Sequence, residues 1–171
     1  MSDQLKLRLI LNGKSAAIPA IREAVHSIRA EGHRLEVRVT WESGDAERYA
    51  AEAVRDGVDV IIAGGGDGSI NEVAGGMLGT GQATRSKLAV LPLGTANDFA
   101  TSCGIPIGDP LAALRLAATG NDHAIDVGKI NDHYFVNVAS GGFGAEVTTN
   151  TPPELKKALG GAAYSLMGVV T

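Results

Sequence analysis

The sequence predicts an α/β fold: a parallel β-sheet with helices on both faces, followed by the start of a β-rich second domain. Segments of strand length alternate with segments of helix length as far as Gly120, and two β-type segments, 124–130 and 134–139, then follow with only three residues between them. Alternating strands and helices imply parallel βαβ units, whereas so short a connection implies an antiparallel hairpin. We therefore expect one domain over 1–123 and the beginning of a second over 124–171.

Four segments have the pattern of strands. The first alternates leucine with Lys6 and Arg8 before it becomes apolar, and the second alternates strictly. The third is a β-branched apolar run and the fourth is a short apolar run, both of strand length. These segments are 5–11, 35–40, 58–63 and 88–91.

Helical patterns fill the intervals between the predicted strands. Pro19 can occupy a first helical turn, and Ile21, Val25 and Ile28 then form one apolar stripe that ends near Gly32. Residues 12–15 and 79–86 are expected to be loops. The other expected helices are 45–55, 69–78, a short one over 99–102, 110–118 and 153–159.

The composition limits the class of protein. A length of 171 residues suits one domain, or one domain and a fragment. Cys103 is the only cysteine, so no disulfide can form within the chain and a cytoplasmic location is expected. A net charge of −4 provides no general basic field for nucleic acid. The N-terminus lacks the pattern of a secretory signal, and no apolar run approaches the roughly 20 residues that span a bilayer.

The stretch Gly64–Gly68 joins the third strand to a helix and contains four glycines and Asp67. Glycine allows positive φ and close backbone approach to a ligand, and a helix N-terminus attracts phosphate. A carboxylate at this place would repel phosphate unless it acts through a cation or positions a proton donor. The dinucleotide fingerprint is excluded because Ser69 replaces its third glycine, and a Walker loop at Gly13 is excluded because Arg8 stands where that motif needs glycine.

Four loops follow the predicted strands and should meet at the carboxyl edge of the sheet, where parallel sheets bind ligands. They contain Asn12–Ser15, Thr40, Gly64–Ser69 and Gly94–Asp98.

Several of these residues also have a purely structural interpretation. Thr95, Asn97 and Asp98 are all good N-cap residues, and one of them is expected to cap the short helix that follows. Lys14 can contact phosphate, but a lone loop lysine is more often solvated. Asp126 either faces solvent by strand alternation or points toward the cleft, and alternation favours solvent. The four histidines lack metal-ligand spacing.

Two motifs together, Gly64–Val73 and Leu91–Ala100, resemble the diacylglycerol-kinase catalytic family, and within it the bacterial YegS-type lipid kinases. NAD kinases and phosphofructokinases share the glycine loop, but the paired second motif is much more specific. Ser69 stands where the family commonly has threonine and keeps the hydroxyl. Four further segments fit the subgroup: Leu11–Ser15, Val37–Glu42, Ile125–Val127 and Gly141–Gly144.

The resemblance implies an N-terminal nucleotide-binding domain of the NAD kinase and diacylglycerol kinase type. It implies ATP-dependent phosphorylation of a membrane lipid hydroxyl, of the phosphatidylglycerol or diacylglycerol type, in phospholipid metabolism. Mg²⁺ is the expected cation, with Ca²⁺ as the alternative, and the enzyme would be cytoplasmic or peripheral to the inner face of the membrane. A kinase of a soluble acceptor, such as NAD or a sugar, and a non-catalytic nucleotide-binding module are the alternatives.

By the same resemblance, Asp67 would act near the metal and phosphates. The general base and most of the metal site are expected beyond Thr171, because family members are longer and complete their β-rich domain there. No metal ligand is assigned with certainty within the chain, and the oligomeric state is left open. The nucleotide would be held by Thr40, Gly66, Asp67, Gly68, Ser69, Ile70, Asn71, Glu72 and Thr95, with Lys14, Asn97, Asp98 and Asp126 as a supporting polar network.

Overall fold

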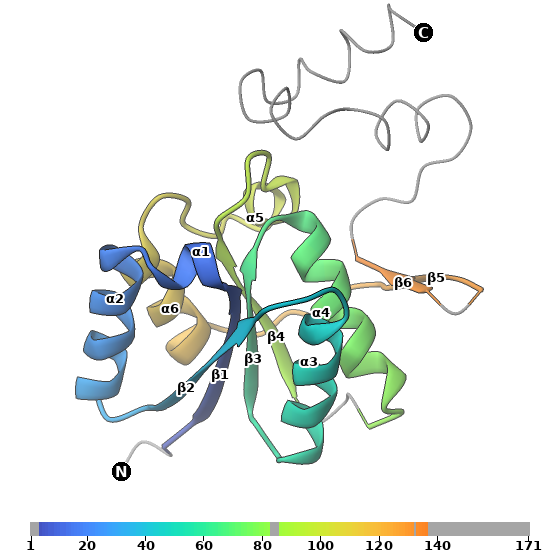
Figure 1. The fold of residues 1–171 in the computed structure, drawn as a ribbon, viewed down its shortest axis with the longest axis horizontal. Coiled ribbons are helices and arrows are strands. Elements are labelled where there is room, and N and C mark those ends of the chain that lie inside the picture. The colour runs from blue at the N-terminus through green and yellow to red at the C-terminus, as the bar shows by residue number, and fades with distance from the viewer. Residues whose placement is uncertain (1–3, 83–85, 132, 137–171) are drawn as a thin grey trace, which may run out of the picture.

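The computed structural model describes residues 4–82, 86–131 and 133–136. Its centre is a four-stranded sheet in the order β2-β1-β3-β4, in which every neighbouring pair of strands is parallel (Figure 1). The predicted parallel sheet is confirmed, and each strand lies within two residues of its predicted range. The strands are β1 (Lys6–Asn12), β2 (Arg34–Thr40), β3 (Val60–Gly65) and β4 (Lys87–Pro92).

Helices cover both faces of the sheet, as predicted (Figure 1). Alternation along β1 explains the two layers, because successive side chains point to opposite faces of a strand. Leu7, Leu9 and Leu11 pack in one buried cluster and Ile10 in the other. The first cluster lies under α2 (Pro19–Ala30) and α6 (Pro110–Thr119), and the second under α3 (Asp45–Arg55) and α4 (Asp67–Gly79).

The loop predicted over 12–15 is instead largely α1 (Gly13–Ala16), a single helical turn. The side-chain oxygen of Asn12 accepts a hydrogen bond from the Ser15 N–H at 2.8 Å and so caps this turn. Asparagine is common in loops and at N-caps alike, so the local sequence does not distinguish the two. The helix predicted from Ser69 begins two residues earlier, at Asp67.

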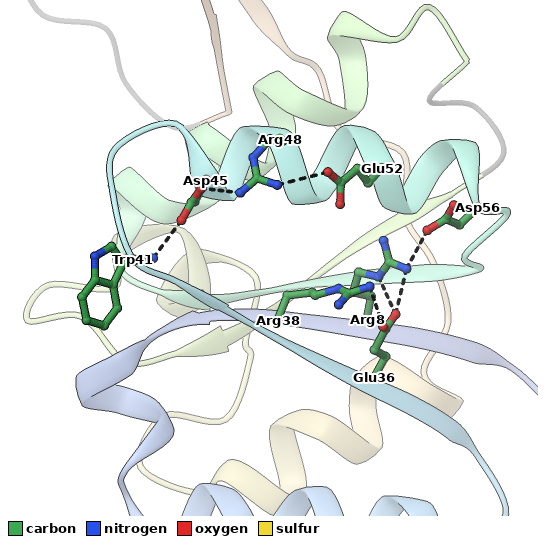
Figure 2. Close-up of polar contacts among 8 residues, drawn as sticks. All are labelled: Arg8, Glu36, Arg38, Trp41, Asp45, Arg48, Glu52 and Asp56. Carbon is green, nitrogen blue, oxygen red and sulfur yellow. Dashed lines mark hydrogen bonds and ion pairs between the residues drawn. The ribbon is translucent and has the colours of Figure 1, made fainter.

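A buried arginine joins the outer strand pair to α3 (Figure 2). Arg8 on β1 is 4% exposed; its Nε donates to Glu36 at 2.8 Å and its Nη2 donates to Asp56 at 2.7 Å. Glu36 is the cross-strand neighbour of Arg8 on β2, and Asp56 follows the last residue of α3. Because a buried charge must be paired, this network fixes the carboxyl end of α3 over β1 and β2.

The contact between α3 and α4 depends on one glycine of an adjacent pair. A Cβ on Gly76 would overlap the carbonyl oxygen of Glu47 on α3, whereas a Cβ on Gly75 would meet no described residue outside its own helix within 4 Å. Neither glycine has positive φ. The two positions therefore differ in packing and share the same helical backbone.

Gly76→Ala is expected to lower the free energy of unfolding by about 1–3 kcal/mol, because the two helices must separate to admit the methyl group. Gly75→Ala is expected to raise it by about 0.5–1 kcal/mol through the higher helix propensity of alanine. Urea unfolding of both variants and the wild type measures the two effects. Equal stability of the two variants would contradict this packing of α3 on α4.

The predicted hairpin is confirmed in a shorter form. β5 (Gly128–Ile130) and β6 (His133–Phe135) are antiparallel, and Asn131 in the turn has a left-handed φ of 54°. Residues 124–127 are not part of a strand. The end of the second predicted segment, the predicted helix over 153–159 and the motif Gly141–Gly144 lie outside the described residues, and the domain boundary at 123/124 stays a prediction.

Candidate functional site

The ends of the four strands lie at one edge of the sheet. Asn12 pairs with Thr40 at the end of β1 and β2, and Gly65 pairs with Pro92 at the end of β3 and β4. The loops that follow these strands therefore begin at the same edge, as their topology predicts. Figure 1 shows α1 and α5 (Asp98–Ser102) at this edge, together with the start of α4.

Contacts inside the protein explain two glycines at the end of β3. A Cβ on Gly64 would lie 2.9 Å from the Cβ of Leu11, and a Cβ on Gly65 would overlap the hydroxyl of Ser69. None of the glycines in 64–68 lies in the left-handed region, so positive φ is not the property of glycine that is used here. Close approach of neighbouring groups is what requires glycine at these two positions.

The two glycine motifs touch each other through their backbones. A Cβ on Gly94 would lie 2.5 Å from the Cα of Gly66, and a Cβ on Gly66 would lie 3.1 Å from the Cα of Gly94. Glycine at these positions lets the loop after β3 and the loop after β4 come together.

Gly68 is the exception among these glycines. It is exposed in the first turn of α4, and among the described residues outside its own helix no atom would lie within 4 Å of a Cβ built on it. The N–H groups of a first helical turn lack acceptors within the helix and lie at the positive end of its dipole. The N–H groups of Gly68 and Ser69 therefore lack acceptors within the helix, and Gly68 lies beside open space at the edge of the sheet, which is the form of an anion-binding cradle.

Asn97 shapes the second loop. It is 5% exposed and has a left-handed φ of 54°. Its side-chain oxygen accepts from the Gly94 N–H at 2.8 Å, and its side-chain nitrogen donates to the Gly94 carbonyl at 2.8 Å. Asn97 occupies the N-cap position of α5 but makes no side-chain cap bond, so the expected capping by Thr95, Asn97 or Asp98 is not what closes this helix.

Asp67 supplies the cap of α5 from the first turn of α4. One carboxylate oxygen accepts from the Phe99 N–H at 3.0 Å, and the other accepts from the Asp98 N–H at 3.2 Å. These bonds join the two motifs across about thirty residues of sequence. The acid among phosphate-binding amides thus has a structural partner: its negative charge faces the positive end of a second helix.

Asp45 fixes the loop between β2 and α3 (Figure 2). No motif in the sequence indicates this role for Asp45. One oxygen of its buried carboxylate accepts from the N–H groups of Trp41 at 2.8 Å and Glu42 at 3.2 Å. The other oxygen accepts from Arg48 at 2.6 Å. The Trp41 N–H, then Arg48, then the Glu42 N–H lower the pKa of Asp45 to about 2.

Asp45→Asn is expected to destabilise the fold at neutral pH and to have little effect in strong acid. The folded-state pKa of about 2 is lower than the usual carboxyl value of about 3.9, so the ionised form contributes stability above pH 4 that is lost as the pH falls toward 2. Urea midpoints of variant and wild type should differ at pH 7 and converge near pH 2. Glu47→Gln, an exposed acid of the same helical turn, is the control. A difference that is independent of pH would contradict this assignment.

The family described as diacylglycerol kinase catalytic domain matches residues 6–130 of the sequence. The chain belongs to this family. Relatives named "Probable lipid kinase YegS-like" from Chromohalobacter salexigens and Yersinia enterocolitica are 54% and 55% identical over 95% of the chain. The chain covers 52% and 55% of these relatives, so it spans about half the length of the curated relatives it matches. A crystal structure described as a diacylglycerol kinase from Bacillus anthracis has a TM-score of 0.74 and 28% identity, and the match covers 100% of this chain and 56% of that chain.

Several residues that the family resemblance assigns to the nucleotide site lie at the common edge of the sheet. Thr40 ends β2, and Thr95 and Asp98 are exposed in and after the second loop. Lys14 is exposed on α1, directly after β1. These residues come from separate segments of the chain and are brought together by the sheet.

Other residues that the resemblance assigns to this site have positions or partners that their sequence pattern does not indicate. Ile70 is 1% exposed and belongs to the core cluster under α4, and its N–H donates to the Gly66 carbonyl at 3.2 Å, so in this structure it packs the helix against the sheet. The side-chain oxygen of Asn71 accepts from the Val136 N–H at 3.0 Å and ties α4 to the residue that follows the hairpin. Glu72 and Asp126 are exposed, and for Asp126 this agrees with the solvent-facing interpretation.

Within the described ranges, no three His, Cys, Asp or Glu side chains gather into a metal-binding group. Among the helices that the structure describes, none is long and apolar enough to cross a membrane. Mg²⁺ commonly uses only one or two protein carboxylates together with substrate phosphates. Two acids, Asp67 and Asp98, lie at this edge, and the Asp67 carboxylate accepts from the Asp98 N–H. These residues fit a cation that is held mainly by phosphate.

Proposed function

We propose that this chain is the nucleotide-binding part of an ATP-dependent lipid kinase that phosphorylates a hydroxyl of a membrane lipid of the phosphatidylglycerol or diacylglycerol type. Membership of the diacylglycerol kinase catalytic family supports the activity. The names of the similar relatives support a lipid acceptor. One structural observation carries the site: contacts inside the protein account for Gly64, Gly65 and Gly66, whereas Gly68 faces open space in the first turn of α4.

In this proposal the backbone N–H groups of Gly68 and Ser69 hold phosphate oxygens, and the dipole of α4 favours their charge. Asp67 positions the phosphates and their cation, because its carboxylate holds the second loop against the first. Bound ATP with Mg²⁺, or with Ca²⁺ as the alternative, would supply the phosphoryl group and neutralise its charge. The other residues assigned to the nucleotide and its surroundings are Thr40, Gly66, Ile70, Asn71, Glu72 and Thr95, supported by Lys14, Asn97, Asp98 and Asp126.

The transfer reaction is tested with radiolabelled ATP, Mg²⁺ and vesicles that contain phosphatidylglycerol or diacylglycerol. The longer relative from Chromohalobacter salexigens serves as the reference, because this chain covers 52% of it. Label in a lipid supports the proposal and identifies the acceptor. Label in NAD or a sugar but in no lipid would replace it with a soluble-acceptor kinase. For this chain, calorimetric titration with ATP tests the nucleotide site directly, and an absence of binding would refute it.

A further inference from the structure

Trp41 is the only tryptophan of the sequence, and its side chain is 94% exposed. The other large apolar side chains exposed in the described ranges show between 37% and 53% of their surface. Burying an indole removes about 150–250 Å² of surface from water, so leaving one open is costly. An exposed tryptophan beside a candidate ligand site is therefore a candidate contact for the ligand.

The loop that carries Trp41 is held by hydrogen bonds to one buried carboxylate. Its N–H and that of Glu42 both donate to the buried carboxylate of Asp45, which Arg48 holds from the other side (Figure 2). Gly44 supplies the left-handed φ of 87° that leads into α3. A side chain on such a loop can bind a ligand without first ordering its own backbone.

Trp41 directly follows the last residue of β2, at the edge where the cradle lies. Thr40 pairs with Asn12 on β1, and β1 is the neighbour of β3, which leads to Gly68. Two strand spacings, about 9–10 Å, thus separate the end of β2 from the end of β3 along the sheet. A nucleotide whose phosphates lie at Gly68 can extend its ribose and base along this edge toward β2.

The charges of the loop that carries Trp41 and of the first turn of α3 favour an uncharged ligand group over an anionic membrane. Glu42 and Glu47 are exposed acids on either side of the turn, and Asp45 is already paired with Arg48. An anionic lipid surface is attracted by basic segments and would be repelled here. A purine base is neutral and has a flat π-face of the kind that stacks on indole.

We propose that Trp41 stacks against the purine base of the nucleotide whose phosphates bind at Gly68. The inference rests on the proposed nucleotide site and adds a determinant of affinity for the base. Its negative control is a ligand that has the phosphates but no base, namely tripolyphosphate.

The single tryptophan allows a direct test by fluorescence. ATP is expected to quench the indole emission with the same midpoint that calorimetry gives for binding, whereas tripolyphosphate should bind without quenching. Trp41→Ala should weaken ATP binding roughly 5- to 150-fold, the range for one base–aromatic stack, and leave tripolyphosphate affinity unchanged. Trp41→Phe should recover most of the lost ATP affinity.

Three results would overturn the inference, and they can be told apart. If ATP and tripolyphosphate both bind and Trp41→Ala weakens neither, the stack is absent while the phosphate site stands. If anionic phosphatidylglycerol vesicles alone shift the emission to the blue and ATP causes no quenching, Trp41 is a membrane contact. If neither ATP nor tripolyphosphate binds the wild-type chain, the nucleotide site itself is refuted.

Discussion

Gly68→Ala is expected to abolish measurable ATP binding while leaving the protein at least as stable as the wild type. The new methyl group would occupy the open space in front of the first turn of α4, where no described residue outside the helix lies within 4 Å. It would displace phosphate from the N–H groups of Gly68 and Ser69. Charge-assisted hydrogen bonds are worth about 1.5–3 kcal/mol each, so losing two lowers affinity at least roughly 100-fold. The free energy of unfolding should rise by about 0.5–1 kcal/mol.

Gly75→Ala is the matched control for this experiment. Gly75 lies two turns further along α4, and in the described part of the chain no residue outside the helix lies within 4 Å of an added Cβ; the substitution gains the same helix propensity. Calorimetry with ATP and urea unfolding should show equal stability for the two variants and a loss of binding only for Gly68→Ala. Wild-type affinity in Gly68→Ala would show that phosphate binds elsewhere and would remove the main structural support for the proposed function.

The sheet and its two layers could be predicted because their signals are local. Side chains two residues apart share a face of a strand, so Leu7, Leu9 and Leu11 indicate one buried face within a few residues of sequence. The order of strands and helices then implies parallel pairing. The turn at α1 could not be predicted, because Asn12 suits a loop and an N-cap equally and only the bond to Ser15 decides.

The meeting of the loops at one edge of the sheet could be predicted from topology, but the packing and partners of their residues could not. Gly64, Gly66 and Gly68 look alike in sequence, and only the packing around each one distinguishes a structural glycine from an open one. The bonds of Asp67 are made to residues distant in sequence. The sequence indicates Trp41 only as a part of the motif Val37–Glu42. Its exposure depends on which elements surround the side chain, and hydrophobic periodicity does not predict that exposure.

Asp67→Asn is expected to lower ATP affinity through two effects that can be measured separately: the loss of a cap bond and the loss of a charge near the cation. The amide keeps one acceptor for the N–H groups of α5 but turns its NH₂ toward the other, so one of the two cap bonds is lost. Loss of a cap lowers the free energy of unfolding by about 0.5–2 kcal/mol and loosens the loop that meets Gly66 at Gly94. Affinity should therefore fall roughly 10-fold even with EDTA present, and further with Mg²⁺, because the carboxylate charge near the cation is also removed.

Calorimetry with and without Mg²⁺ separates the two parts, and hydrogen exchange at the Asp98 and Phe99 amides reports the cap itself. Faster exchange at these amides together with weaker binding in EDTA identifies Asp67 as a positioning residue that acts through the second loop. A loss of affinity confined to Mg²⁺, with unchanged exchange, would show that the charge acts on the cation alone and that the cap is incidental to binding. Asp59→Asn is the matched control, because its carboxylate accepts from the Lys6 N–H at the opposite edge of the sheet. Any effect of that variant should be confined to stability, since it lies one strand length away from the cradle at Gly68.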